Sequence, residues 1–324
     1  MAEIKIAVRL DSLGNVNPSA ASLRRVLSWV AASGATSVEL CGRRVLNVSE
    51  LSDTAVRTLR KILDDLNLRI ASIRFPTRHG FDHLENLDRR IEATKSAMRA
   101  AYRLGAPLVV NQIGPVPRPP SSASGNSSGS GLGSSGADSS VSGLALGGLP
   151  PEGLSLSEAQ AWAAGTSPDA SSEPETVDPR WNTLREVLDD LGRFGARTGA
   201  FFAAETGTEP GAHLARLIDM SSEAYIAVAL NPGQLIVNRH SVPDAVAALK
   251  DRIRIVNAVD GVLDLSAGRG IAVPVGQGTA DFPSLLGQLE DIPYRGPFVV
   301  GRPGMAPETA PNEIMQSIEY LRNL

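Results

Sequence analysis

The sequence contains few of the residues from which disulfide scaffolds and metal clusters are built. Among its 324 residues are one cysteine, four histidines and 4% aromatic residues, so an internal disulfide is excluded and a reducing compartment is favoured. No run reaches the roughly 18 apolar residues of a membrane-spanning helix. The first ten residues, MAEIKIAVRL, lack the basic start and small-residue cleavage site of a signal peptide. These absences predict a cytoplasmic protein with no membrane partner.

An excess of charge of either sign is also missing. The 31 basic and 35 acidic residues give a net charge of −4, and a weakly acidic surface does not attract nucleic acid. The hydrophobic share of 42% and the charged share of 20% are typical of a globular domain with a sizeable core. We therefore expect a protein that acts on, or binds, a small molecule rather than nucleic acid.

Short runs of branched apolar residues alternate along the chain with longer segments of helical periodicity. Eight such runs are present, at 4–10, 36–40, 68–75, 106–114, 200–207, 225–231, 253–260 and 297–304. Each precedes an amphipathic segment, at 19–34, 51–67, 83–105, 181–199, 211–220, 241–252, 281–292 and 312–324. Eight regular βα units predict an α/β protein, a closed (β/α)8 TIM barrel that forms a single domain over residues 1–324. An open, doubly wound sheet is the rival architecture.

One segment interrupts this alternation. Residues 115–178 are dominated by Ser, Gly and Pro, and such a stretch cannot bury enough apolar area to offset the entropy lost on ordering its backbone. We expect a flexible low-complexity insertion after strand 4. It follows a strand at the end of the barrel where active sites lie, so it is either a lid, with a short helix at 154–165, or a tolerated surface insertion.

Polar side chains occur at the carboxyl end of every predicted strand, where barrel enzymes place their active sites. The candidates are Arg9, Asp11, Glu39, Arg43, Arg74, Arg78, Asn111, Gln112, Glu205, Asn231, Gln234, Asn257, Asp260 and Arg302. One such group could arise by chance. Their recurrence on all eight strands predicts a polar pocket.

Four segments in the second half of the chain resemble the motifs of one family. They are AAETGTEPG (203–211), ALNPGQL (229–235), IRIVNAVD (253–260) and VPVGQGTADFPSLLGQLEDIPYRGPFVVGRPG (273–304). In order and spacing they resemble strands 5 to 8 of the xylose-isomerase-like barrels, also called the sugar phosphate isomerase/epimerase superfamily. The resemblance covers nearly the whole chain apart from the insertion, and it implies a (β/α)8 barrel that binds a carbohydrate.

The resemblance also implies a metal site, which the residues of this chain do not reproduce. The family holds a divalent cation with Glu, Asp, His and Glu from strands 5 to 8, and the matching positions here are Glu205, Asn231, Asn257 and Gly301. Neutral amides are weak donors for Mg²⁺ and Mn²⁺, and glycine offers no side chain. We therefore expect no metal cofactor at these positions, or at most a weak Mn²⁺ or Mg²⁺ site.

Two functions stay open. In the family, the strand-5 and strand-8 glutamates move protons on opposite faces of a sugar. The first function is an active sugar isomerase or epimerase with Glu205 as the base, assisted by Asp260 and Arg302. The second is a degenerate barrel that binds a sugar, sugar acid or sugar phosphate without catalysis. Amide groups both donate and accept hydrogen bonds, as sugar hydroxyls require. The residues expected to bind the ligand are Arg9, Glu39, Arg74, Asn111, Gln112, Asn231, Gln234 and Asn257.

Arginines bear on the charge of that ligand. Seven of them fall at or just beyond predicted strand ends, namely Arg9, Arg43, Arg74, Arg78, Arg239, Arg269 and Arg302. Guanidinium groups bind phosphate and carboxylate through paired hydrogen bonds, so convergence of three or more would indicate an anionic carbohydrate. Related barrels often dimerise through their helices, and a homodimer is a further expectation.

Three further segments of the chain are weaker candidates for a functional site. Cys41 lies beside Arg43 and Arg44, which could activate its thiol, although a lone cysteine at a strand end is more often a small packed residue. His79 and His83 could approach a metal together with Asp82, although a loop and helix start explain them equally well. The segment GRGIAVPVGQG (268–278) is predicted to be a loop.

An apurinic endonuclease is excluded, because it needs a histidine-rich trinuclear metal cluster and a basic DNA-binding face.

Overall fold

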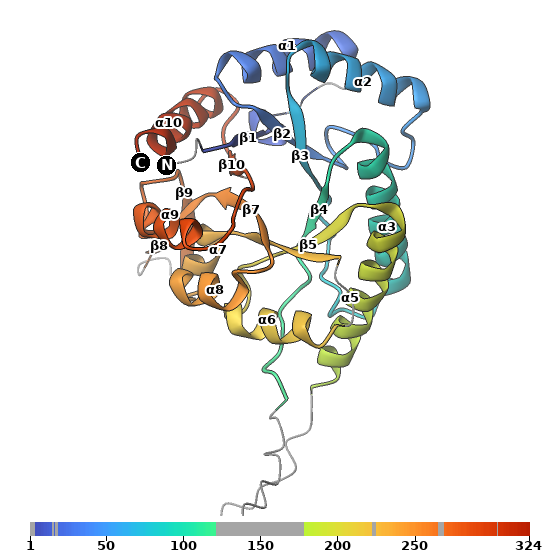
Figure 1. Cartoon of the computed structure of the whole chain (residues 1–324), viewed down its shortest axis with the longest axis vertical. Coiled ribbons are helices and arrows are strands. Elements are labelled where there is room, and N and C mark those ends of the chain that lie inside the picture. Colours follow the sequence, from blue (N-terminus) through green and yellow to red (C-terminus); the bar gives the residue numbers. More distant parts are fainter. Residues whose placement is uncertain are drawn as a thin grey trace, which may run out of the picture. The chain divides into compact units, whose positions relative to one another are not determined.

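In the computed structural model, eight parallel strands close into a barrel (Figure 1). The structure describes residues 4–14, 16, 19–120, 178–221, 225–264, 269–302 and 304–324. Around the barrel the strand order is β1-β10-β7-β6-β5-β4-β3-β2. Their bounds are β1 Ile6–Arg9, β2 Ser37–Cys41, β3 Arg69–Arg74, β4 Leu108–Asn111, β5 Phe201–Glu205, β6 Ile226–Leu230, β7 Ile253–Ala258 and β10 Phe298–Val300. The prediction of a closed (β/α)8 barrel is confirmed, and the doubly wound sheet was the wrong alternative.

Helices surround the strands on the outside of the barrel (Figure 1). Their N-caps carry the expected residue types: the Ser52 and Asp281 side chains accept hydrogen bonds from the amides of Ala55 and Ser284, at 3.2 and 3.0 Å. The eight helices predicted from periodicity are α1 Ala20–Ala32, α2 Asp53–Asp65, α3 Leu87–Leu104, α5 Pro179–Thr198, α6 Gly211–Asp219, α8 Val242–Leu249, α9 Phe282–Glu290 and α10 Ala310–Arg322. None of the described helices is long and apolar enough to cross a membrane.

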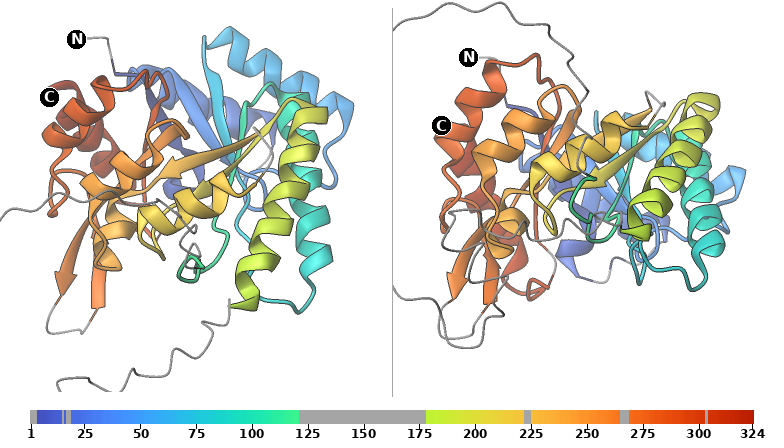
Figure 2. Two further views of the ribbon diagram at one scale, coloured as in Figure 1. Left: turned by 60° about the horizontal axis from the view of Figure 1, so that its bottom comes forward. Right: turned by 90° about the horizontal axis from the view of Figure 1, so that it is seen from below.

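Three local features depart from the sequence predictions. Segment 268–278, expected to be a loop, contains strand β9 (Arg269–Val273), which pairs antiparallel with β8 (Asp260–Asp264). This hairpin extends away from the barrel (Figure 2). The turn after β6 forms the short helix α7 (Pro232–Val237), and a 3-10 helix, η1 (Leu10–Leu13), follows β1.

The predicted insertion lies largely outside the described residues. Residues 1–119 and 178–324 form one compact unit that contains the barrel. Residues 115–120 are described and have irregular backbone. The remainder, with the short helix expected at 154–165, falls outside, so both the flexible loop and the lid stay predictions.

The barrel interior has two chemically different layers. Strand side chains alternate, so every second residue faces the axis. The layer toward the amino ends of the strands is apolar and small, and consists of Ala7, Ala71, Leu108, Val110, Ala203, Ala227, Ala229, Ile255 and Val299. The layer toward the carboxyl ends is polar, and contains Arg9, Glu39, Ser72, Glu205, Asn231 and Asn257. The fold thus brings five of the predicted site residues to one level of the barrel.

Candidate functional site

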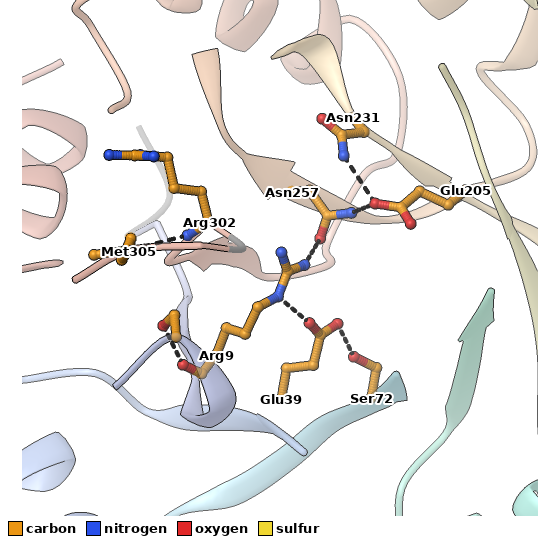
Figure 3. Close-up of polar contacts among 9 residues, drawn as sticks. Arg9, Glu39, Ser72, Glu205, Asn231, Asn257, Arg302 and Met305 are labelled. Atoms are coloured by element: carbon orange, nitrogen blue, oxygen red, sulfur yellow. Dashed lines mark hydrogen bonds and ion pairs between the residues drawn. The ribbon is translucent and has the colours of Figure 1, made fainter. Parts of the chain in front are cut away.

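A buried guanidinium lies at the centre of the polar layer (Figure 3). Arg9 Nε donates to Glu39 Oε1 at 2.6 Å, and Arg9 Nη2 donates to Asn257 Oδ1 at 2.9 Å. The Ser72 hydroxyl donates to Glu39 Oε2 at 2.7 Å. Arg9 is 2% exposed and Glu39 is 0% exposed, so water does not screen this ion pair. Burial alone would lower the pKa of Arg9, but the charges of Glu39 and Glu205 outweigh it and raise that pKa.

Two amides connect this pair to Glu205. Asn257 Nδ2 and Asn231 Nδ2 both donate to Glu205 Oε1, at 2.7 and 2.8 Å. Two further hydrogen bonds hold Asn231 in place. Its backbone N–H donates to the Thr206 hydroxyl at 2.9 Å, and its side-chain Oδ1 accepts from the backbone amide of Gln234 at 3.1 Å. One continuous chain of hydrogen bonds therefore runs from Ser72 to Asn231 across the barrel (Figure 3).

Gly301, the strand-8 position, has no room for a side chain. Its φ of +103° is a left-handed conformation that favours glycine. A Cβ there would clash with Ser12 Oγ and lie 3.1 Å from Ser12 Cβ and 3.3 Å from Arg9 Cβ. Ser12 itself is fixed, since its hydroxyl donates to the Arg9 carbonyl at 2.5 Å. The volume that a glutamate at position 301 would enter is thus occupied by the arginine and its support.

The residues at the four family metal positions do not fit a divalent cation. Glu205 is the single carboxylate, and both amides turn their NH₂ groups, which cannot ligate a metal, toward it. Asn257 Oδ1 already accepts from the Arg9 guanidinium, whose positive charge would repel a second cation. Within the described part of the chain, no group of three or more His, Cys, Asp or Glu is placed to hold a metal ion. His79, His83 and Asp82 therefore do not form the metal group considered from the sequence.

Asp260, expected to assist catalysis, is engaged with the backbone of the β9–α9 connection. Its carboxylate accepts from the amides of Gly261, Gly276, Gly278 and Ala280 at 2.8 to 3.1 Å, and it is fully buried. Such a set of backbone donors fixes a loop. The geometry therefore gives Asp260 the task of holding the segment after the β8–β9 hairpin.

Other predicted residues lie outside the network. Arg302 points away from it (Figure 3) and forms a two-pronged ion pair with Glu313, at 2.8 and 3.0 Å. Asn111 bonds Thr77 of the β3–α3 loop through both its amide atoms, at 3.0 and 3.4 Å. Gln112 is exposed, and the Gln234 side chain is half-buried. None of these four side chains hydrogen-bonds to the described residues of the network.

Unpartnered buried atoms gather at the carboxyl end of the barrel. Asp11 Oδ1, Arg74 Nε and Glu209 Oε1 are buried without a hydrogen-bond partner among the described residues, and they belong to the ends or following loops of β1, β3 and β5. Arg90 Nε and Trp181 Nε1 are likewise without a described partner. Because buried polar atoms are nearly always satisfied, the three atoms at the carboxyl end are candidates for contact with a ligand. Glu209 was missed in the sequence, although it lies in the same motif as Glu205.

A basic pocket of about 740 Å³ opens beside the β3–α3 loop. It is lined by four arginines, with His79 and Glu85 the other ionisable groups, and the arginines are Arg43, Arg78, Arg89 and Arg90. Arg43 is preorganised by stacking on Phe75, with its Cζ 4.3 Å from the ring centre. Of the seven arginines considered from the sequence, Arg43 and Arg78 line this pocket, which is fewer than the three whose convergence would indicate an anionic ligand; Arg89 and Arg90 complete the group. Arg89 and Arg90 were missed because they belong to a helix start rather than to a strand end.

Cys41 has the surroundings of a packed residue. Its thiol is buried, and burial raises its pKa. A raised pKa disfavours the thiolate that nucleophilic chemistry requires. The nearby arginines do not overcome this effect.

The Arg9–Glu39 pair predicts a specific pattern of stabilities. Arg9→Met should lower the free energy of unfolding by about 3–5 kcal/mol, because it leaves a buried carboxylate without its cation. Arg9→Met combined with Glu39→Met should be more stable than Arg9→Met alone. Arg24→Met, which breaks the exposed Arg24–Asp65 pair, is the control and should cost no more than about 1 kcal/mol. Chemical denaturation followed by tryptophan fluorescence measures all four proteins, and equal losses for Arg9→Met and Arg24→Met would contradict the analysis.

Glu209 predicts a dependence of stability on pH. Burial raises its pKa from 4.5 to about 7, so the folded state favours the protonated carboxyl. Its contribution is fully present below pH 4.5 and is lost as the pH rises to about 7, which amounts to about 3 kcal/mol. Relative to the wild type, Glu209→Gln should therefore gain stability between these pH values, while the exposed control Glu50→Gln should not. Parallel pH profiles for wild type and Glu209→Gln would refute the assignment.

Comparison with known proteins places this geometry in one family. The xylose isomerase-like TIM barrel family matches residues 27–137 and 156–324. No curated protein sequence matches the chain significantly.

Solved structures agree on the fold at low identity. A xylose isomerase domain protein from Planctomyces limnophilus has a TM-score of 0.69 and 16% identity, covering 99% of this chain and 95% of that one. A xylose isomerase-like TIM barrel protein from Mycobacterium smegmatis, in complex with magnesium, has a TM-score of 0.64 and 15% identity, with coverage of 99% and 97%. D-allulose 3-epimerase from Methylomonas sp., in complex with D-allulose, has a TM-score of 0.61 and 14% identity, with coverage of 99% and 97%. Since the family match spans well over half of the sequence, the protein belongs to the xylose isomerase-like TIM barrels.

Proposed function

We propose that this protein binds a carbohydrate at the carboxyl-terminal mouth of its barrel without a divalent metal ion. The observation that carries the proposal is the Arg9 guanidinium, held between Glu39 and Asn257 at the centre of the polar layer. It supplies internally a positive charge of the kind that a metal ion brings. Relatives with this fold bind D-allulose and D-tagatose, as the structures of the Methylomonas epimerase and a Clostridium cellulolyticum epimerase record. The unpartnered atoms of Asp11, Arg74 and Glu209 supply polar contacts for such a ligand.

The same geometry argues against epimerisation. Inverting a carbon centre requires proton transfer on both faces of the sugar, and Gly301 leaves one face without an acid or base. On the other face, Glu205 Oε1 already accepts hydrogen bonds from two amides, so this oxygen is engaged within the network. A binding protein requires none of these groups to exchange protons.

The basic pocket supports an anionic carbohydrate. Arg43, Arg78 and Arg89 are exposed and form no ion pair with any described residue. Guanidinium groups bind phosphate and carboxylate oxygens in pairs. A volume of about 740 Å³ is also in the range of small-molecule sites, about 300–1,000 Å³. We infer that a sugar phosphate or sugar acid directs its charged group here.

Isothermal titration tests the proposal with D-allulose, D-allulose 6-phosphate and manganese as probes. We expect manganese to bind more weakly than about 1 mM, with no change in Glu205→Gln. The phosphate ester should bind about tenfold more tightly than the free sugar, since a hydrogen bond to a charged group is worth about 1.5–3 kcal/mol. In the double variant Arg43→Gln with Arg89→Gln, the two sugars should bind with equal affinity. In the exposed control Arg57→Gln on α2, the phosphate ester should still bind more tightly. Micromolar manganese binding that Glu205→Gln abolishes would contradict the proposal, and equal affinities for the two sugars would refute its anionic part.

An active isomerase or epimerase is the second candidate, favoured by the presence of Glu205 at the strand-5 position. Incubation of D-allulose in deuterated water, followed by NMR, separates the two functions. The binding protein should incorporate no deuterium beside the carbonyl. Incorporation that is lost in Glu205→Gln would establish Glu205 as a base and the protein as an enzyme.

A further inference from the structure

The opposite, amino-terminal mouth of the barrel is also hollow. A funnel of about 810 Å³ opens there. Seven of the eight barrel strands contribute residues at or just before their first position, and these are Lys5, Ser37, Arg69, Leu108, Phe201, Ile253 and Pro297. The funnel is therefore centred on the barrel axis, at the end remote from the polar layer.

The apolar layer next to this end is rich in small side chains. Barrel interiors are usually filled by bulky branched residues, but five of the nine residues in this layer are alanines, namely Ala7, Ala71, Ala203, Ala227 and Ala229. Ala71 lines the funnel together with Ile70, Leu108, Phe201 and Ile253. The floor is apolar, and half-buried Phe201 adds an aromatic ring stacked on Tyr225, with 4.6 Å between ring centres.

The rim carries positive charge only. Five of the lining residues are cations, namely Lys5, Arg69, Arg254, Arg295 and Arg322, and no Asp or Glu is among the described residues that line the funnel. Neutral acceptors hold three of them: Lys5 Nζ donates to the Arg295 carbonyl at 3.2 Å, Arg295 Nη1 to the Tyr294 carbonyl at 2.7 Å, and Arg322 Nη2 to the Gly34 carbonyl at 2.8 Å. None of the five forms an ion pair with a described carboxylate.

Like charges gathered at one concavity repel one another unless an anion joins them. A cleft lined by one sign of charge with apolar walls also concentrates the field on a counter-ion. Arg69 and Arg254 are exposed, and their guanidinium groups form no ion pair with a described carboxylate, so these side-chain donors are available to a ligand. The apolar floor would be covered by an uncharged part of the same ligand.

We propose that this axial funnel is a second binding site, for a multiply charged anion that carries an aromatic or apolar body, of the class of nucleoside polyphosphates. The phosphates would contact the rim and the base would lie on the floor beside Phe201. The site goes beyond the carbohydrate function and does not depend on it, because it shares no residue with the polar layer or the basic pocket.

Titration of the full-length protein with ATP and with inorganic tripolyphosphate tests this site. ATP should bind saturably and at least several-fold more tightly than tripolyphosphate, because only ATP covers the apolar floor. Arg69→Gln with Arg254→Gln should weaken ATP binding about tenfold, the loss expected when charge-assisted contacts are removed. Arg57→Gln with Arg60→Gln, on the exposed face of α2, is the matched control with the same change of charge and should leave the affinity unchanged.

Three results would overturn the proposal. They are no saturable ATP binding at physiological salt, an equal loss in the control double variant, and equal affinities for ATP and tripolyphosphate. Circular dichroism of both double variants confirms that folding is retained, which is expected because all four arginines are exposed. Arg69→Gln with Arg254→Gln should leave the affinity for D-allulose unchanged. The carbohydrate site and the axial funnel are therefore tested independently of each other.

Discussion

A buried ion pair between Arg9 and Glu39 constrains the rest of the polar layer. Two charges removed from water are tolerated only when each has good hydrogen-bonding partners. The Ser72 hydroxyl donates a hydrogen bond to the Glu39 carboxylate at 2.7 Å, and Asn257 Oδ1 accepts one from the Arg9 guanidinium at 2.9 Å. The Asn257 side chain also donates to Glu205, and a larger residue at Gly301 would collide with Ser12, which supports the arginine. The Asn257 amide and the glycine are therefore compatible with the central cation.

The arrangement changes what the carboxyl end of the barrel can do. In a barrel with a metal ion, an exchangeable cation polarises the substrate and is held by charged ligands. Here the Arg9 guanidinium, which is covalently part of the chain and 2% exposed, lies at the centre of the layer, and Glu205 accepts hydrogen bonds from two amides. In the proposed function, this satisfied network is the polar floor of the ligand site. The unpartnered groups that could recognise that ligand lie above it, on the loops after β1, β3 and β5.

Much of the fold followed from the sequence, because alternating apolar runs and amphipathic segments report directly on strands and helices. The gathering of Arg9, Glu39, Glu205, Asn231 and Asn257 at one level of the barrel also followed, since each lies at the middle or in the carboxyl-terminal half of a strand, or directly after it. Their pairing did not, because hydrogen bonds between strands that are far apart in the chain depend on barrel register.

The tasks of individual side chains were equally hidden in the sequence. Asp260 accepts hydrogen bonds from the amide of its neighbour Gly261 and from three amides of the β9–α9 connection, up to 20 residues away. Arg302 is paired with Glu313 on α10. The amino-terminal funnel was not predicted, because its lining comes from the first residues of strands that are far apart in the chain.

Anomalous diffraction at the manganese absorption edge, from crystals grown with manganese in large excess, tests the central claim most directly. The account predicts no manganese peak bonded to Glu205, and an Arg9 guanidinium that lies between Glu39 and Asn257. A manganese ion bonded to Glu205, with the Arg9 side chain displaced from the barrel axis, would contradict it.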